Sequence, residues 1–319
     1  MKKTFFAAVC LLFFFGACES NSNEKNFSQN RTRPYLIVLG VAQDGGFPQA
    51  GCRKNCCEEA WKNIALRRFV SSLALVDPPS GARWLFDCTP DFKEQHKLLD
   101  SLSPAKDKKN PDGIFLTHAH IGHYAGLINL GREVMSTKQI PVYAMPRMKN
   151  FLEQNGPWSL LVELKNISIV PMQNDSAISL TPEISVTPVL VPHRDEFSET
   201  VGFRISCNGK SVLFIPDIDK WGKWNRSIVE EIKKSDIALI DGTFFSADEI
   251  PGRNLKEIPH PLIEESMQLL SSLSSSEKNK IHFIHFNHTN PALNHDSKEF
   301  HQIINAGFHV AEQGEVFEF

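Results

Sequence analysis

A cluster of three histidines follows a short apolar segment, and it constrains the fold more than any other feature of the sequence. His118, His120 and His123 come directly after the apolar residues 113–116. Side chains two residues apart point the same way from an extended segment, and the third histidine comes at the next turn. Three buried imidazoles would leave polar nitrogens unsatisfied unless a cation binds them. The spacing therefore predicts a metal site at the end of a strand.

Short apolar segments alternate with amphipathic ones along the rest of the chain. The strand candidates are bounded mostly by Gly, Pro, Asn or Asp, and they are 35–41, 71–76, 83–87, 113–116, 140–144, 184–191, 201–207, 211–215, 237–240 and 281–284. The helix candidates carry apolar residues three and four positions apart, and they are 91–101, 124–135, 147–155, 226–234 and 261–273. This order predicts an α/β fold of stacked sheets flanked by helices in a single domain.

The composition excludes several classes of protein. With 41% apolar and 22% charged residues, the 319-residue chain is neither disordered nor collagen-like. Its formal net charge of -3 gives no reason to expect nucleic acid as a partner. We therefore expect an enzyme-sized protein that acts on a small-molecule substrate.

Residues 1–18 have the pattern of a bacterial export signal. Lys2 and Lys3 precede an apolar run over 5–15, which is too short to span a bilayer core of about 30 Å. The small residues before Cys18 resemble a lipobox, in which the cysteine is acylated and becomes the mature N-terminus. The alternative is a plain signal peptide with an incidental cysteine.

The segment 19–33 is polar and has the composition of a structureless tether. We therefore expect one catalytic domain over 34–319, attached to a membrane only through a lipid on Cys18. Such a lipoprotein would reside in the bacterial cell envelope, on the periplasmic face or at the cell surface.

The sequence resembles the metallo-β-lactamase superfamily, whose members carry H-x-H-x-D-H where this chain has residues 118–123. His193 then matches the third metal-binding motif, and Asp217 matches the carboxylate that bridges two metals. His285 or His288 matches the final histidine. The resemblance implies an αββα sandwich of two mixed sheets flanked by helices, with one or two zinc ions, or alternatively iron or manganese.

Three segments resemble the pyrroloquinoline-quinone biosynthesis protein B branch of that superfamily. They are VLGVAQDGGFPQ at 38–49, LFDCTPD at 85–91 and HFNHTNP at 285–291. This branch implies an iron-dependent oxygenase or hydroxylase as an alternative activity. Because a fold does not determine a substrate, and because this chain carries an export signal, the activity does not follow from the resemblance.

Gly122 departs from the superfamily pattern, which has Asp at this position as a ligand of the second metal. Losing a carboxylate removes a donor oxygen and a negative charge. A second metal position formed by His123, Asp217 and His285 is therefore expected to be weaker than the first.

Three arrangements remain open at this stage. Asp44 in the glycine-rich segment could supply the missing oxygen, or His288 could supply an extra nitrogen. In the third arrangement, a single metal binds His118, His120 and His193 and keeps an open position for water.

Hydrolysis of a phosphodiester or another small ester is the expected reaction. A bound divalent metal lowers the pKa of its water from 15.7 to about 7, and the metal-bound hydroxide then attacks the ester. Asp217 is the expected metal-bridging residue, and His260 is placed where phosphodiesterase members carry a histidine that protonates the leaving group. The alternative for His260 is a surface histidine near a helix start. A non-catalytic metal-bearing binding lipoprotein is the further alternative for the whole chain.

Cys52, Cys56 and Cys57 form a second cluster of potential ligands. Relatives carry a C-x-C-x-x-C structural zinc knuckle at this position, whereas the spacing here is C-x-x-x-C-C. A structural zinc and a disulfide from Cys52 to Cys56 or Cys57 are both compatible with the sequence of an exported protein.

Overall fold

The computed structural model describes residues 31–103 and 108–319. The predicted signal with Cys18, and the tether up to residue 30, lie outside the described residues. Within the described ranges, no helix is long and apolar enough to cross a membrane.

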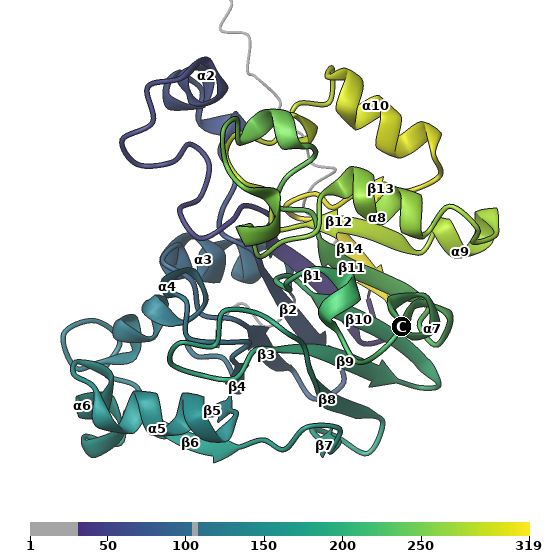
Figure 1. Cartoon of the computed structure of the whole chain (residues 1–319). Coiled ribbons are helices and arrows are strands. Elements are labelled where there is room, and N and C mark those ends of the chain that lie inside the picture. The colour runs from purple at the N-terminus through teal and green to yellow at the C-terminus, as the bar shows by residue number, and fades with distance from the viewer. Residues whose placement is uncertain (1–30, 104–107) are drawn as a thin grey trace, which may run out of the picture.

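Two seven-stranded sheets pack face to face between layers of helices, as predicted (Figure 1). The first sheet contains, in spatial order, β14 (Val316–Glu318), β1 (Tyr35–Gly40), β2 (Ser72–Asp77), β3 (Ala82–Phe86), β4 (Gly113–Phe115), β5 (Ile140–Ala144) and β6 (Ile167–Pro171). The second contains β13 (His309–Val310), β12 (Ile281–Ile284), β11 (Ile237–Asp241), β10 (Lys210–Ile215), β9 (Val201–Cys207), β8 (Ile184–Leu190) and β7 (Ile178–Ser179).

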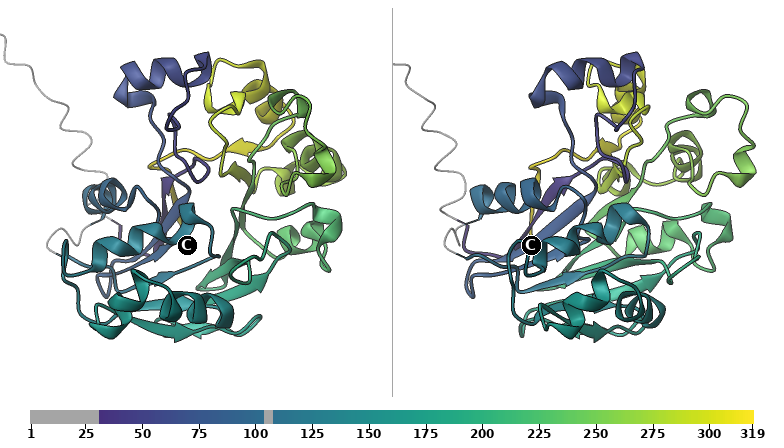
Figure 2. Two further views of the ribbon diagram at one scale, coloured as in Figure 1. Left: turned by 60° about the vertical axis from the view of Figure 1, so that its left-hand side comes forward. Right: turned by 90° about the vertical axis from the view of Figure 1, so that its left-hand side faces the viewer.

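The helices pack mostly on the outer faces of the two sheets, except for α2, which lies at one end of the molecule and buries only two residues (Figure 1). They are α2 (Asn55–Lys62), α3 (Phe92–Leu102), α4 (Ile121–Tyr124), α5 (Pro146–Gln154), α6 (Trp158–Glu163), α7 (Ile228–Lys233), α8 (Ile263–Leu269), α9 (Ser275–Lys278) and α10 (Lys298–Asn305). Short 3₁₀ turns occur at Ile64–Leu66, Ala125–Leu130, Trp221–Lys223, Ala247–Glu249, Leu255–Glu257 and Pro291–Leu293. Figure 2 shows α2 at the same end of the molecule as the C-terminal helix α10.

Alternation along the strands separates the core into two layers. Leu36 of β1 belongs to the buried cluster between the sheets, together with Phe203 of β9. The next residue, Ile37, packs on the opposite face with Leu99 of α3. Successive side chains of a strand point to opposite faces, and burying each large apolar side chain contributes about 1.5–3 kcal/mol. Both faces of the first sheet are therefore covered, as its near-continuous apolar strands require.

The strand directions bring several carboxyl ends to one edge of the sandwich. β3 runs parallel to β4, and β10 runs parallel to β11 and β12. The two sheets also join at this edge, because Ala42 after β1 pairs with Phe286 after β12. Side chains that follow these strands consequently converge.

All ten predicted strands form, with ends within one residue of the prediction. The predicted helix 124–135 is wrong, because α4 ends at Tyr124 and a 3₁₀ turn follows over Ala125–Leu130. Gly126 explains the break: a Cβ at this position would lie 2.1 Å from the carbonyl oxygen of Thr89, so the chain here packs directly on the loop after β3. Helices α2, α6, α9 and α10 and the edge strands β6, β7, β13 and β14 were not predicted.

Candidate metal centre

The predicted ligands come from segments that are far apart in the sequence and follow different strands. His118 and His120 follow β4, His193 follows β8, Asp217 follows β10 and His285 follows β12. One atom from each of His118, His120, His193 and Asp217 lies within 4.8 Å of all the others. The structure therefore brings the first predicted ligand set together.

The spacing within this set is that of atoms that share one cation. His193 Nε2 lies 3.2 Å from His120 Nδ1 and 3.2 Å from Asp217 Oδ2. His118 Nε2 lies 3.4 Å from the same Asp217 oxygen. Ligands held at 2.0–2.1 Å by a tetrahedral zinc are separated from each other by roughly 3.3 Å.

A second set adjoins the first and consists of Asp44, His123 and His285. Asp44 Oδ1 lies 3.3 Å from His123 Nε2. Asp217 Oδ2 lies 4.0 Å from the same nitrogen, so the Asp217 carboxylate stands between the two sets. This is the position that a bridging carboxylate requires.

Buried atoms without hydrogen-bond partners mark the inside of the centre. The Nε2 atoms of His118, His123 and His285 and the Oδ1 atom of Asp44 are all buried and unpaired. Leaving such an atom unpaired costs about 1–3 kcal/mol. Several unpaired atoms within one cluster of potential ligands fit a bound cation, which would satisfy them together.

Asp44 occupies the space that a side chain at position 122 would need. A Cβ built on Gly122 would lie 2.2 Å from Asp44 Oδ1 and 2.5 Å from Asp44 Cα. A carboxylate is thus present at the centre despite Gly122, but it comes from the turn after β1. Sequence reasoning named Asp44 only as one of two candidates.

His288, the other candidate, lies elsewhere. Its Nδ1 is 3.4 Å from Cys57 Sγ and 3.7 Å from Cys56 Sγ. The chain turns after Phe286, so that His285 joins Asp217 while His288 joins the cysteines. His288 is therefore not the group that stands in for the missing carboxylate.

Other acidic side chains orient the candidate ligands. His123 Nδ1 donates to Asp87 Oδ2 over 2.7 Å, which turns its Nε2 toward Asp44. Glu196 Oε2 lies 3.2 Å from His120 Nε2 and leaves Nδ1 of that ring to face His193. Asp87 was missed as a functional residue, although an Asp directly after an apolar strand was the available signal.

His260 is buried beside the second set rather than exposed at a helix start. It is 3% exposed and precedes α8 by three residues. Its Nδ1 donates to Asp241 Oδ2 over 2.9 Å and lies 3.2 Å from Asp217 Oδ1. Burial alone would lower the pKa of His260, but Asp241 and Asp217 raise it to about 9. Asp241, the last residue of β11, was likewise missed.

The electrostatics of the ligands suit a cation. Burial lowers the pKa of His118 well below its usual range and also lowers that of His285, so both rings are neutral. Burial would raise the pKa of Asp217, but His193 and His260 beside it hold that pKa well below its usual range. Neutral imidazoles around an ionised carboxylate are the protonation states that metal binding requires. Burial would also lower the pKa of His123, but Asp87 and Asp44 raise it well above its usual range, so this ring has to release a proton when a cation binds.

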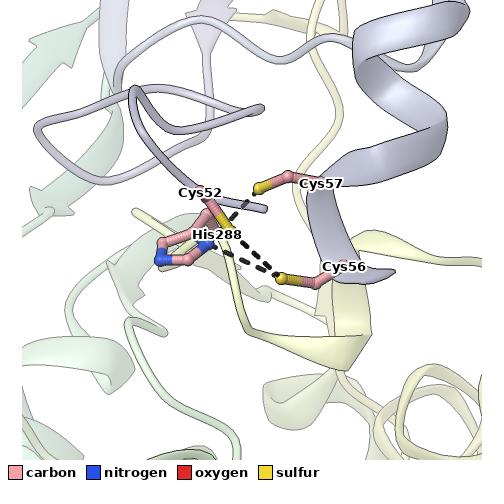
Figure 3. A group of neighbouring side chains, drawn as sticks. All are labelled: Cys52, Cys56, Cys57 and His288. Carbon is pink, nitrogen blue, oxygen red and sulfur yellow. Dashed lines mark hydrogen bonds between the residues drawn. The ribbon is translucent and has the colours of Figure 1, made fainter. Parts of the chain in front are cut away.

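Cys52, Cys56, Cys57 and His288 form a separate ligand group (Figure 3). All three cysteines are free thiols, and Cys52 Sγ lies 3.8 Å from Cys56 Sγ. Thiolates held at about 2.3 Å by a tetrahedral zinc are roughly 3.8 Å apart. Three sulfurs and one imidazole nitrogen make a complete tetrahedral set, and sequence reasoning had assigned the fourth ligand, His288, mainly to the other site.

The remaining side chains near the centre contribute to packing. Trp221 Nε1 donates to Ser266 Oγ, and Trp224 Nε1 donates to the carbonyl oxygen of Leu190. Both rings are buried, and Asp195 accepts a hydrogen bond from Thr200 rather than from a histidine ligand.

Comparison with known protein families and curated sequences gives consistent matches. The family model described as "Beta-lactamase superfamily domain" matches residues 82–286. The coenzyme PQQ synthesis protein B of Methylococcus capsulatus (strain Bath) is 29% identical over 308 residues, covering 88% of this chain and 98% of the relative. That of Methylorubrum extorquens (strain PA1) is 26% identical over 305 residues, with the same coverage.

Solved structures show the same fold. The crystal structure of Zn²⁺-bound PqqB from Methylobacterium extorquens superposes with a TM-score of 0.75 at 24% identity, covering 89% of this chain and 100% of that chain. A diphosphatase from the PhnP family superposes with a TM-score of 0.65 at 22% identity, covering 90% and 97% of the two chains. At these identities, the likeness concerns the fold.

Proposed function

Because the chain belongs to the metallo-β-lactamase superfamily, we propose that it is a metal-dependent hydrolase with a two-metal centre that acts on a phosphodiester or another small ester. The observation that carries this proposal is the set of unpaired buried atoms on His118, His123, His285 and Asp44, which lie within two adjoining groups of imidazoles and carboxylates. These residues fit divalent cations.

His118, His120, His193 and Asp217 would hold the first cation. Asp44, His123 and His285 would hold the second, with Asp217 between the two. Divalent cations in this centre supply a hydroxide nucleophile at neutral pH and polarise a phosphoryl oxygen.

The protein's own groups supply the rest of the chemistry. Asp87 fixes the tautomer of His123, and Glu196 does the same for His120, so that each ring presents its free nitrogen to the centre. His260 is held through Nδ1 by Asp241, and this carboxylate favours the protonated form of the ring. Its Nε2 has no hydrogen-bond partner among the described residues, and from this atom it donates a proton to the leaving group.

The cysteine group would hold a third metal ion. Cys52, Cys56, Cys57 and His288 would bind zinc in a structural role, since four protein ligands leave no open position for a substrate.

An iron-dependent oxygenase is the second candidate function. It is supported by the similarity to coenzyme PQQ synthesis protein B over 88% of the chain and by a ligand set that suits iron as well as zinc. Elemental analysis of protein purified from its native compartment, followed by two assays, distinguishes these functions. A hydrolase contains zinc or manganese at the histidine centre and cleaves a bis-aryl phosphate, whereas an oxygenase contains iron and consumes oxygen.

The cellular location is inferred from the sequence alone. Gly16-Ala17-Cys18 after the apolar run supports acylation of Cys18 and attachment to a membrane of the cell envelope. The domain over 34–319 then acts outside the cytoplasm on a small molecule.

A further inference from the structure

Asp44 reaches the metal centre from a partly exposed turn. Its side chain remains 31% exposed, and Gly45 and Ala50 on the same turn are exposed. The Gly46 N–H donates to the carbonyl oxygen of Gln43 over 2.8 Å, and two backbone hydrogen bonds between Phe47 and Arg68 hold the middle of the turn. A carboxylate that supplies a metal ligand needs a fixed position, so the two ends of the turn matter.

The near end is tied to the segment that carries His285 and His288. The Gln43 N–H donates to the carbonyl oxygen of Phe286 over 2.8 Å. The side-chain amide of Asn287 donates to Gln43 Oε1 over 2.6 Å. The residue before Asp44 is thus bonded to the residue before His288.

The far end of the turn runs into Cys52 and helix α2. This helix buries only Cys57 and Ala60, its N-cap Lys54 makes no side-chain hydrogen bond, and Trp61 on it is 48% exposed. A helix of eight residues is unstable without tertiary contacts. The contact of Cys56 and Cys57 with His288 is therefore a main tie between this end and the rest of the protein (Figure 3).

We infer that metal binding by Cys52, Cys56, Cys57 and His288 positions Asp44 and thereby sets the affinity of the second cation position, formed by Asp44, His123 and His285. This inference rests on the two-metal centre proposed above. Filling the cysteine site closes the segment between Gln43 and Cys57 against the His285–His288 segment at both ends. When the site is empty, the far end is released, and Asp44 must be ordered at the moment the second cation binds.

Titration with Co²⁺ tests this coupling, because thiolate ligation gives an intense absorption that imidazole and carboxylate ligation lacks. Affinities at each position are measured by competition with a chelator in wild type, His288→Ala, His288→Cys, Asp44→Ala and the control His295→Ala, which removes an exposed histidine. His288→Ala should lower the affinity of the cysteine site for Co²⁺, read from the thiolate absorption, and weaken the second cation position about 10- to 100-fold. The first position, at His118, His120 and His193, should be unchanged.

The other variants make the result specific. His288→Cys restores a four-ligand site and should restore the second position, and His295→Ala should behave as wild type. Combining His288→Ala with Asp44→Ala should weaken the second position no further than Asp44→Ala alone. An unchanged second position in His288→Ala, or equal weakening of the first position, would overturn the coupling.

A second variant, Asn287→Ala, tests the same inference if His288→Ala does not fold. Asn287→Ala keeps both ligand sets and removes the hydrogen bond to Gln43, so it should weaken the second position while the thiolate absorption remains. No weakening in that variant would contradict the inference. Because turnover is not measured, absence of hydrolase activity leaves the coupling standing, whereas a wild type with one histidine-bound cation would overturn both the coupling and the two-metal centre.

Discussion

The Asp44 carboxylate fills the space beside Gly122, with its Oδ1 only 2.2 Å from where a Cβ on that glycine would lie. Asp44 therefore occupies the space that a side chain at position 122 would fill, although 78 positions separate the two residues in the sequence. A carboxylate from another segment therefore lies beside the histidine motif, although position 122 itself carries none.

Any side chain at position 122 should disturb the second cation position. A Cβ there would also lie 2.5 Å from Asp44 Cα, so the backbone of the turn has to move. We expect Gly122→Ala, and still more Gly122→Asp, to weaken the second cation and to lower the melting temperature. Gly222→Ala is the matched control, since its Cβ would meet nothing within 4 Å. Tighter binding of the second cation in Gly122→Asp would contradict the assignment of Asp44.

Removing a ligand and removing the proton donor should have different effects. His118→Ala, His120→Ala and His193→Ala each should abolish tight binding of the first cation, because each deletes a ligand. His260→Ala should keep the cations and reduce the rate of bis-aryl phosphate cleavage by about 10²- to 10⁴-fold. Metal content measured beside turnover distinguishes the two classes. Full metal content in the three ligand variants would refute the site.

Glu249 should make the stability of the fold depend on pH. Burial raises its pKa to about 7, while Thr289 Oγ1 donates to its carboxylate over 2.8 Å. An unfolded Glu has a pKa of about 4.3, so between about pH 4.3 and 7 the folded state binds more protons, and the free energy of unfolding falls as pH rises. As pH rises from about 5 to about 8, the free energy of unfolding of wild type should therefore fall relative to that of Glu249→Gln, which has no proton to lose at this position.

Urea unfolding at the two pH values measures this difference. Glu264→Gln is the control, because Glu264 is exposed. An equal change of stability in wild type and Glu249→Gln across this window would mean that Glu249 does not retain its proton in the folded protein.

If Cys18 carries a lipid anchor, its removal should move the protein from the membrane fraction to the soluble fraction. Cys18→Ala should release the protein from membranes, because an acyl chain contributes about 0.8 kcal/mol per buried CH₂ and the polar tether contributes almost nothing. Cells that express the wild type or the variant are fractionated and the membranes are washed with salt. Retention of Cys18→Ala in the washed membranes would exclude the lipoprotein assignment.

The strands and the main ligands could be predicted because both depend on local pattern. Apolar segments such as 113–116 and 281–284 have strand length and end at histidines, and those ends converge in the fold. The short edge strands β7 and β13 carry too few residues for a pattern. The expected helix 124–135 failed because a close contact of Gly126 with another loop, rather than local propensity, decides the backbone there.

The replacement ligand could be proposed from the sequence but not selected. Asp44 was the first candidate and His288 the second, and both stand on turns that follow strands. The choice depends on side-chain direction: a turn after Phe286 sends His288 to Cys56 and Cys57, whereas Asp44 faces His123. The supporting residue Asp87 was missed because its role appears only once the position of its partner His123 is known.

The number of tightly bound cations in wild type and Asp44→Ala tests the two-metal centre most directly. Each protein is equilibrated with metal and a competing chelator, and its metal content is determined. We predict that wild type retains two cations at the histidine–aspartate centre and one at the cysteine cluster, and that Asp44→Ala loses only the cation shared with His123 and His285. Equal metal content in both proteins would contradict the account, because Asp44 would then not be a ligand.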